Sequence, residues 1–127
     1  MTLTLGQIAN FPNLYQEISG FKLPIQVVYK LSRLRKEIEF HISFYKENVQ
    51  KILSECAELD EQGLPRQLEN GNGVMLKPDC IEKCIKQIEE LGALAIDIPD
   101  IYFSILDFDG VEISMQSFEI IAPFIKE

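Results

Sequence analysis

One stretch of the sequence, residues 23–59, constrains the fold more than any other. It opens on Leu23-Pro24, and no further Pro or Gly occurs before Gly63. Apolar residues recur along it at spacings of three and four, which is typical of a helix with a narrow apolar seam. Pro24 fits the first turn, where a missing N–H does no harm. We therefore predict one long helix over residues 24–59, with a seam of Leu31, Leu34, Ile38, Ile42, Tyr45, Val49 and Ile52, continued by Cys56 and Leu59.

The length of this helix raises the question of what covers its seam. A helix of this size is about 50 Å long, and a chain of 127 residues is too short to enclose it along its whole length. The seam therefore needs either its own chain folded back on it or a second copy of the protein. We expect a homo-oligomer paired through the seam. The alternative is a monomer in which residues 1–20 and 78–125 cover it.

The N-terminal residues 1–20 predict short capping helices. Thr4 and Gln7 have the spacing of a capping box, in which each side chain accepts a hydrogen bond from a backbone N–H at a helix start. Phe11-Pro12 separates a first short helix from a second one. The apolar residues expected to pack on the start of the long helix are Leu5, Ile8, Phe11, Leu14 and Ile18.

Beyond the long helix the sequence predicts a hairpin, a partner helix and a mixed C-terminal segment. Asn and Gly alternate over residues 70–73, which favours a turn in a β-hairpin over residues 64–76. Residues 78–91 predict a helix folded antiparallel on the long one. In residues 94–127 we expect short strands at 94–98 and 101–103, a turn capped by Ser104, and a terminal helix capped by Ser114.

The overall composition fits one domain of mainly α fold with a minor β part, an α+β contribution limited to small hairpins. Apolar residues make up 46% of the chain, enough for a folded core, and the net charge is −8. Such a charge disfavours binding to nucleic acid or to an anionic membrane. No apolar stretch approaches the length of a membrane span and no signal-peptide pattern is present, so we expect an intracellular protein.

No residue pattern predicts an enzyme, a metal site or a cofactor. His41 is the only histidine, and a triad would need partners that the sequence does not indicate. Cys80 and Cys84 have helical spacing, but a closed zinc site needs four ligands. Residues 107–110 read Asp-Phe-Asp-Gly and lack the remaining ligands of a calcium loop. We interpret the cysteines as small apolar residues and the acidic segment as a solvated turn.

A basic and aromatic group early in the long helix is the predicted binding site. It consists of Tyr29, Lys30, Arg33, Arg35, Lys36 and Tyr45. Arg side chains and Tyr rings at helical spacing are suited to holding a phosphorylated small molecule between protomers or to binding a host protein. The alternative is a solvated face whose arginines pair with Glu37 and Glu39 one turn later.

Both ends of the chain resemble a family of short uncharacterised phage proteins. Residues 3–8 read Leu-Thr-Leu-Gly-Gln-Ile, and residues 23–34 resemble the family's "LPVKxAYKLAKL" entry into a long helix. Residues 110–125 resemble its "GIELSPxxLxxLEPFI" ending, with Met115 in place of Pro and Ala122 in place of Glu. The resemblance implies a phage origin and an α-rich protein acting in the host cytoplasm, and it carries no catalytic residues.

These observations lead to one main functional hypothesis and one alternative. The main hypothesis is a non-enzymatic phage accessory protein with an anti-defence role. It would bind a host protein, thereby inhibiting a defence protein, or hold an anionic small molecule, thereby sequestering a nucleotide signal. The alternative is a virion or tail-assembly protein whose long helix pairs with another structural component. Acidic mimicry of nucleic acid by the C-terminal third is a weaker third hypothesis.

Overall fold

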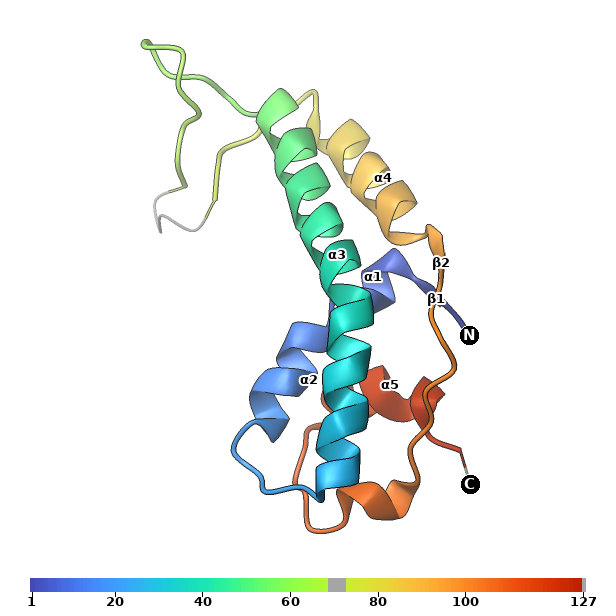
Figure 1. Cartoon of the computed structure of the whole chain (residues 1–127). Helices are drawn as coiled ribbons and strands as arrows, with labels where there is room; N and C mark the ends of the chain where they lie inside the picture. Colours follow the sequence, from blue (N-terminus) through green and yellow to red (C-terminus); the bar gives the residue numbers. More distant parts are fainter. Residues whose placement is uncertain (69–72, 127) are drawn as a thin grey trace.

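The computed structural model of the chain describes residues 1–68 and 73–126. The fold is mainly α, as predicted, and one long helix runs the length of the molecule (Figure 1). The antiparallel partner helix is also confirmed, since α4 returns beside the second half of α3. The helical elements are α1 (Leu5–Ile8), α2 (Phe11–Ile18), α3 (Ile25–Glu55), α4 (Ile81–Gly92) and α5 (Met115–Ile121), with short 3₁₀ turns η1 (Ile105–Phe108) and η2 (Ala122–Phe124).

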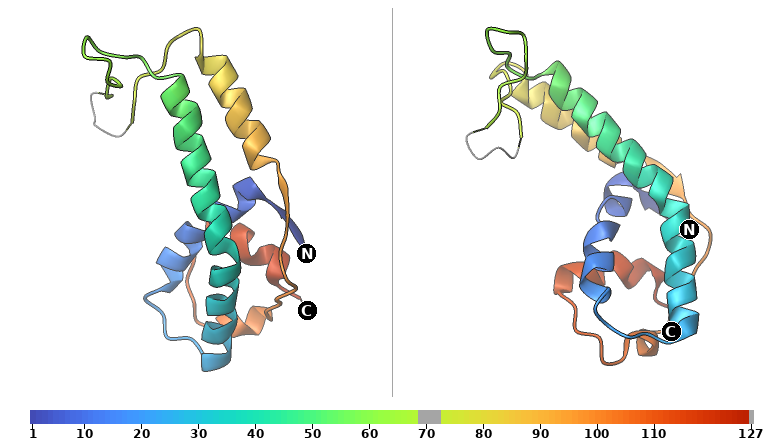
Figure 2. Two further views of the ribbon diagram at one scale, coloured as in Figure 1. Left: turned by 45° about the horizontal axis from the view of Figure 1, so that its top comes forward. Right: turned by 60° about the vertical axis from the view of Figure 1, so that its left-hand side comes forward.

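The molecule has two parts along the long helix, which the two further views separate clearly (Figure 2). We call residues 1–38 and 98–126 the base, in which the first half of α3 is surrounded by α1, α2 and the C-terminal elements. We call residues 39–55 and 81–92 the arm, an antiparallel pair made by the second half of α3 and by α4. Residues 57–68 and 73–80 form the tip segment at the far end of the arm.

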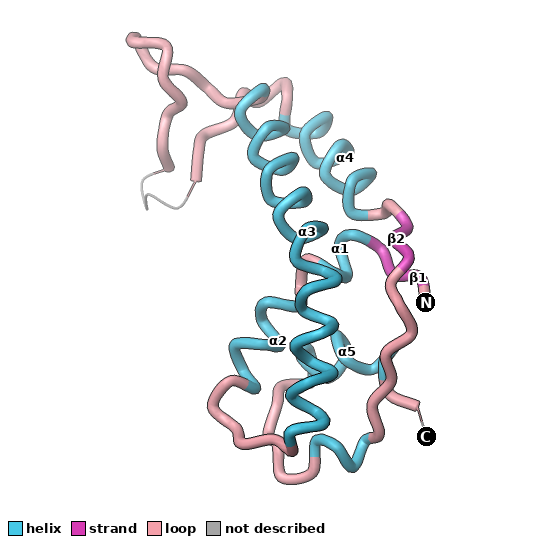
Figure 3. Tube along the Cα trace, viewed as in Figure 1, coloured by secondary structure: helices cyan, strands magenta, loops and turns pink. Residues whose placement is uncertain are grey.

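A small antiparallel sheet closes the chain on itself at the junction of base and arm (Figure 3). Its strands are β1 (Thr2–Thr4) and β2 (Ala95–Asp97), with Leu3 opposite Ile96. The strand expected at residues 94–98 is thus confirmed, whereas its partner at the N-terminus was not predicted. The second expected strand, at residues 101–103, is wrong. Only Phe103 forms a bridge, parallel to Ile125, because its backbone pairs with the turn that ends the chain.

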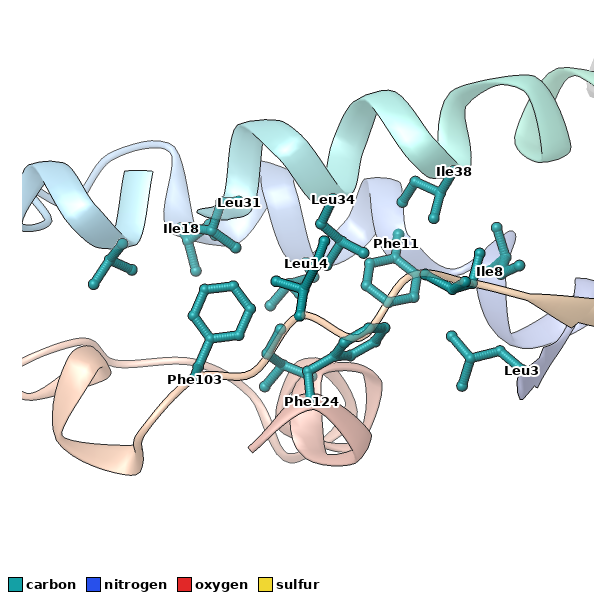
Figure 4. Packing of buried hydrophobic residues seen from close by; sticks show 14 residues of the cluster. Leu3, Ile8, Phe11, Leu14, Ile18, Leu31, Leu34, Ile38, Phe103 and Phe124 are labelled. Carbon is teal, nitrogen blue, oxygen red and sulfur yellow. The ribbon is translucent and has the colours of Figure 1, made fainter. Parts of the chain in front are cut away.

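The core lies in the base, where aliphatic and aromatic side chains from both ends of the chain meet α3 (Figure 4). The apolar N-terminal residues predicted to pack there are all buried. Rings from opposite ends of the chain meet edge to face, with centroids of Phe11 and Phe124 5.6 Å apart. The predicted caps are confirmed as well. Thr4 and Gln7 form a capping box, and the hydroxyls of Ser104 and Ser114 accept backbone N–H groups of η1 and α5.

The long helix ends four residues earlier than predicted, at Glu55 rather than at residue 59. Cys56 is its C-cap, and from Ala57 onward the backbone pairs with residues returning from the tip instead of continuing the helix. The predicted hairpin over residues 64–76 is present as isolated bridges, including Gln67 opposite Val74. Its predicted Asn-Gly turn falls largely on residues 69–72, which lie outside the described residues.

Candidate functional site

The predicted oligomer seam is divided between base and arm. Leu31, Leu34 and Ile38 are buried inside the chain's own core, so the first part of the seam is covered from within one protomer. This agrees with the monomeric alternative for that part and removes these three residues from an oligomer contact. The physical reason is that α1, α2 and the C-terminal segment fill the space beside them. The later seam residues are only partly covered, and their pairing with a second copy stays a prediction; they are Ile42, Tyr45, Val49 and Ile52.

The predicted basic group does not form one cluster, because its six residues point in different directions around α3. Lys30 turns toward the C-terminal segment, where its Nζ donates to the carbonyl oxygen of Tyr102 at 3.0 Å and lies 5.7 Å from the Phe103 ring. Arg35 lies against α2, with its guanidinium carbon 6.0 Å from the Tyr15 ring. Tyr45 is half-buried on the seam side. The structure therefore separates these three residues from the rest of the group.

Tyr29, Arg33 and Lys36 stay together on the solvent side of α3, opposite its buried stripe. Spacings of three and four keep them on one helix face. The same spacing adds apolar residues that the sequence interpretation missed: Ile25 is 79% exposed and Phe40 is 70% exposed. We call Ile25, Tyr29, Arg33, Lys36, Phe40 and Phe44 the outer face of α3. The sequence indicated these residues through their spacing, which places them on the side of the helix opposite the seam.

The outer face has no partner within the described part of the chain. Neither Arg33 nor Lys36 forms an ion pair there, so the pairing of arginines with Glu37 and Glu39 that their spacing allowed is not formed. Phe40 and Phe44 stack on each other with ring centroids 6.3 Å apart, and the His41 ring meets Phe40 edge-on at 5.5 Å. Two cations thus lie between two pairs of large apolar side chains along a helix face that is open to solvent.

A groove between α2 and α3 is the second candidate site. Its cavity is about 480 Å³ and is lined by two cations, Arg35 and Lys46, and by the carboxylate Glu39, with Arg35 beside the Tyr15 ring. Burial raises the pKa of Tyr15 above its usual value, with Arg35 acting in the opposite direction. The hydroxyl therefore stays protonated and donates to the carbonyl oxygen of Leu31 at 2.8 Å. The groove is lined by Pro12, Tyr15, Gln16, Arg35, Ile38, Glu39, Ile42, Ser43 and Lys46.

A larger groove, about 840 Å³, lies between α2 and α5, and its lining includes amide and hydroxyl side chains and the carboxylates Glu17 and Glu119. Both carboxylate oxygens of Glu17, which lines this groove, already accept hydrogen bonds. One Glu17 oxygen accepts from the backbone N–H of Ser114 at 3.0 Å and the other from the Ser114 hydroxyl at 2.9 Å. These bonds lower the pKa of Glu17, the backbone bond most of all. The Glu17 side chain therefore links α2 to the start of α5.

Comparisons with known proteins identify no relative of this chain. No family model, no curated protein and no solved structure matches the chain. Among the described residues, no three His, Cys, Asp or Glu side chains gather as metal ligands would. Across residues 1–68 and 73–126, no helix combines the length and the apolarity that a membrane span requires.

Proposed function

We propose that this protein acts by binding rather than by catalysis, and that the outer face of α3 docks onto a protein partner. The observation that carries the proposal is one solvent-facing line of α3, on which Arg33 and Lys36 lie between two pairs of large apolar side chains and form no ion pair with another described residue. Tyr29 and Phe40, the two rings at its centre, are 68% and 70% exposed. Aromatic residues and arginine are the residue types that contribute most to binding at protein interfaces.

The shape of this face favours a protein over a small molecule. A small ligand binds where a cavity covers most of its surface, whereas a single helix presents a convex surface. A convex helix face fits a groove on another protein, which reads side chains one turn apart. The partner's groove would be apolar along its floor, opposite Tyr29 and Phe40, and acidic at its rim, opposite Arg33 and Lys36.

The biological setting of this proposal comes from the phage resemblance. A phage-encoded accessory protein without catalytic residues would act in the host cytoplasm by occupying a host protein, as an anti-defence protein does. The outer face supports the binding part of this hypothesis, and the setting rests on the resemblance alone.

The experiment is affinity capture from host cells with two charge-matched variants. The test variant is R33E/K36E, which reverses two cations on the outer face. The control variant is K83E/K86E, which makes the same change in net charge on exposed residues of α4. We expect a partner recovered with wild type and control to be lost with the test variant. Purified partner should then bind the wild type directly, with an affinity that falls by at least tenfold for F40A.

Equal recovery of the same partner with R33E/K36E and with K83E/K86E would rule out the outer face. Loss with both variants would show that overall charge matters and not this face. Circular dichroism of each variant checks that the helix content is unchanged, so that a loss of binding is not a loss of folding.

The groove between α2 and α3 supports a second candidate function, binding of a small anionic molecule. Its volume lies within the range of small-ligand sites, and two cations line it, one of them beside an aromatic ring. Native mass spectrometry of protein purified from infected cells tests this directly. A discrete ligand mass that is absent from R35E/K46E would support it. Retention of that mass by the variant would exclude the groove.

A further inference from the structure

Two cysteines meet where the arm joins the tip segment. Cys56 is the residue that ends α3, and Cys80 is the residue that precedes α4. They are far apart in sequence, yet their thiols share a hydrogen bond. Nothing in the proposed binding function uses this contact.

The backbone of the tip segment holds the two thiols in place. The Lys77 N–H donates to the carbonyl oxygen of Cys56 at 2.9 Å, and the Cys80 N–H donates to that of Lys77 at 2.9 Å. The neighbouring residues Ala57 and Leu76 form an antiparallel bridge. Cys80 is therefore brought back to Cys56 by three successive contacts, and their proximity does not depend on one side-chain rotamer.

Access to solvent differs among the three cysteines. Cys56 is 4% exposed and Cys84 is 1% exposed, whereas Cys80 is partly exposed. A soluble reagent therefore reaches Cys80 first, and the Cys56 thiol lies within reach of the modified Cys80. The geometry thus favours reaction at the exposed member of the pair, followed by transfer to the buried one.

We propose that Cys56 and Cys80 form a thiol modification site that a low-molecular-weight disulfide, such as oxidised glutathione, converts to an intramolecular disulfide. The Cys80 thiolate attacks one sulfur of the oxidant, which forms a mixed disulfide and releases one glutathione thiolate. The Cys56 thiolate then attacks the Cys80 sulfur, which forms the Cys56–Cys80 bond and releases the second glutathione. Two protein thiols are oxidised, two glutathione molecules are formed by reduction, and the two thiol protons end on them.

The disulfide would tie the end of α3 to the start of α4 and close a loop of about 24 residues. Reduction would reopen it, as expected for a reversible bond in a reducing compartment. Burial raises the pKa of the Cys80 thiol, and its hydrogen bond to Cys56 adds to the rise. Oxidation is therefore slower than for a fully exposed thiol and has to be followed over time.

The test treats reduced, full-length protein with oxidised glutathione and follows the intact mass. We expect a loss of about 2 Da as the stable product, reversed by dithiothreitol, with a rise in unfolding temperature of about 5–10 °C. Trypsin cuts after Lys51, Arg66 and Lys83, so it places the three cysteines in separate peptides, residues 52–66, 67–83 and 84–86. The product should contain residues 52–66 joined to residues 67–83.

Three cysteine variants make the assignment decisive. C84S should still lose about 2 Da, whereas C56S should stop at a glutathione adduct of about 305 Da on Cys80. C80S should form neither the glutathione adduct nor the disulfide as fast as the wild type does. A stable glutathione adduct on the wild type would overturn the proposal, as would a bond to Cys84 or a disulfide between two chains.

Discussion

The two halves of α3 have the same apolar periodicity and opposite degrees of burial. In the base, Val27, Leu31, Leu34 and Ile38 are all 6% exposed or less. In the arm, every residue from 39 to 55 is described and none is buried. Apolar periodicity in the sequence thus predicts which face of a helix is apolar. It does not predict how much of that face other elements of the fold will cover.

The difference follows from what packs on each half. The base brings α1, α2 and both ends of the chain against one side of α3, so each seam residue is surrounded. In the arm, Ile42 still packs against the edge of the base core, and α4 covers the facing stripe of α3 from one side. On α4, Cys84 is buried while Ile81 and Ile85 stay 40% and 52% exposed. The apolar seam is therefore fully buried in the base and only partly buried in the arm.

The largest expected effect contrasts two leucines on the same helix. Leu34→Ala removes a side chain with 0% exposure and should lower the free energy of unfolding by about 3–4 kcal/mol. Leu53→Ala, in the arm, removes a half-covered side chain and should cost about 1 kcal/mol. Urea unfolding of the two variants measures the difference directly. Equal losses would mean that the arm is as well packed as the base.

The junction between base and arm provides a second contrast, between two glycines. A methyl group on Gly6 would lie 3.1 Å from the carbonyl oxygen of Gly92, whereas one on Gly92 would meet nothing closer than 3.8 Å. Gly6→Ala should therefore push α1 away from α4 and destabilise by about 1–2 kcal/mol. Gly92→Ala should be neutral or stabilise by up to about 1 kcal/mol. Thermal unfolding distinguishes the two, and a stable Gly6→Ala variant would show that the junction yields easily.

The sequence was most informative about the fold where local chemistry decides the structure. Hydroxyl and amide caps at Thr4, Ser104 and Ser114 act within one turn, and each is found where it was predicted. Failures occurred where distant segments decide. The strand over residues 2–4 exists because residues 95–97 pair with it, and α3 stops at Glu55 because the returning tip takes the next backbone groups.

The candidate site was only partly predictable for a related reason. Residue type identified the cations, but their direction depends on neighbours from elsewhere in the chain. Lys30 points away from the group because it donates a hydrogen bond to the carbonyl oxygen of Tyr102. Arg35 points away from it because it packs over the Tyr15 ring. Phe40 resembles a core residue by type, and only its helical phase, half a turn away from the seam, indicates the solvent-exposed position that the structure gives it.

The incomplete burial of the arm allows a specific test of the predicted homo-oligomer. If a second copy covers the arm, Ile85→Glu should shift the protein toward the monomer mass in analytical ultracentrifugation, because it places a charge in that contact. Ile25→Glu is the matched control, since Ile25 is even more exposed but lies on the outer face. The same mass for wild type and Ile85→Glu would remove the arm as an oligomer contact. An equal shift with Ile25→Glu would assign the effect to charge.

The smallest expected effect concerns pH and isolates one contact of the base. Hydrogen bonds from Ser114 and Ser117 lower the pKa of Glu17, and the N-terminal amine does the same for Asp100. A carboxylate whose pKa is lower in the folded state stabilises the fold fully above its unfolded pKa, about 4.3 for Glu. That contribution is lost as the pH falls through the folded pKa. Wild type should therefore lose stability below about pH 4.3 through Glu17 and below about pH 3.9 through Asp100.

Glu17→Gln should remove the Glu17 share of this loss while leaving the Asp100 share. The variant should be less stable than wild type at neutral pH, because the amide binds the Ser114 backbone N–H and hydroxyl more weakly than a carboxylate does. The two unfolding temperatures should converge as the pH is lowered from 6 toward 3. Glu119→Gln changes the same charge at a carboxylate without such bonds among the described residues, so it should leave the pH profile unchanged. A constant gap between wild type and Glu17→Gln would show that the clamp between α2 and α5 does not depend on the charge of Glu17.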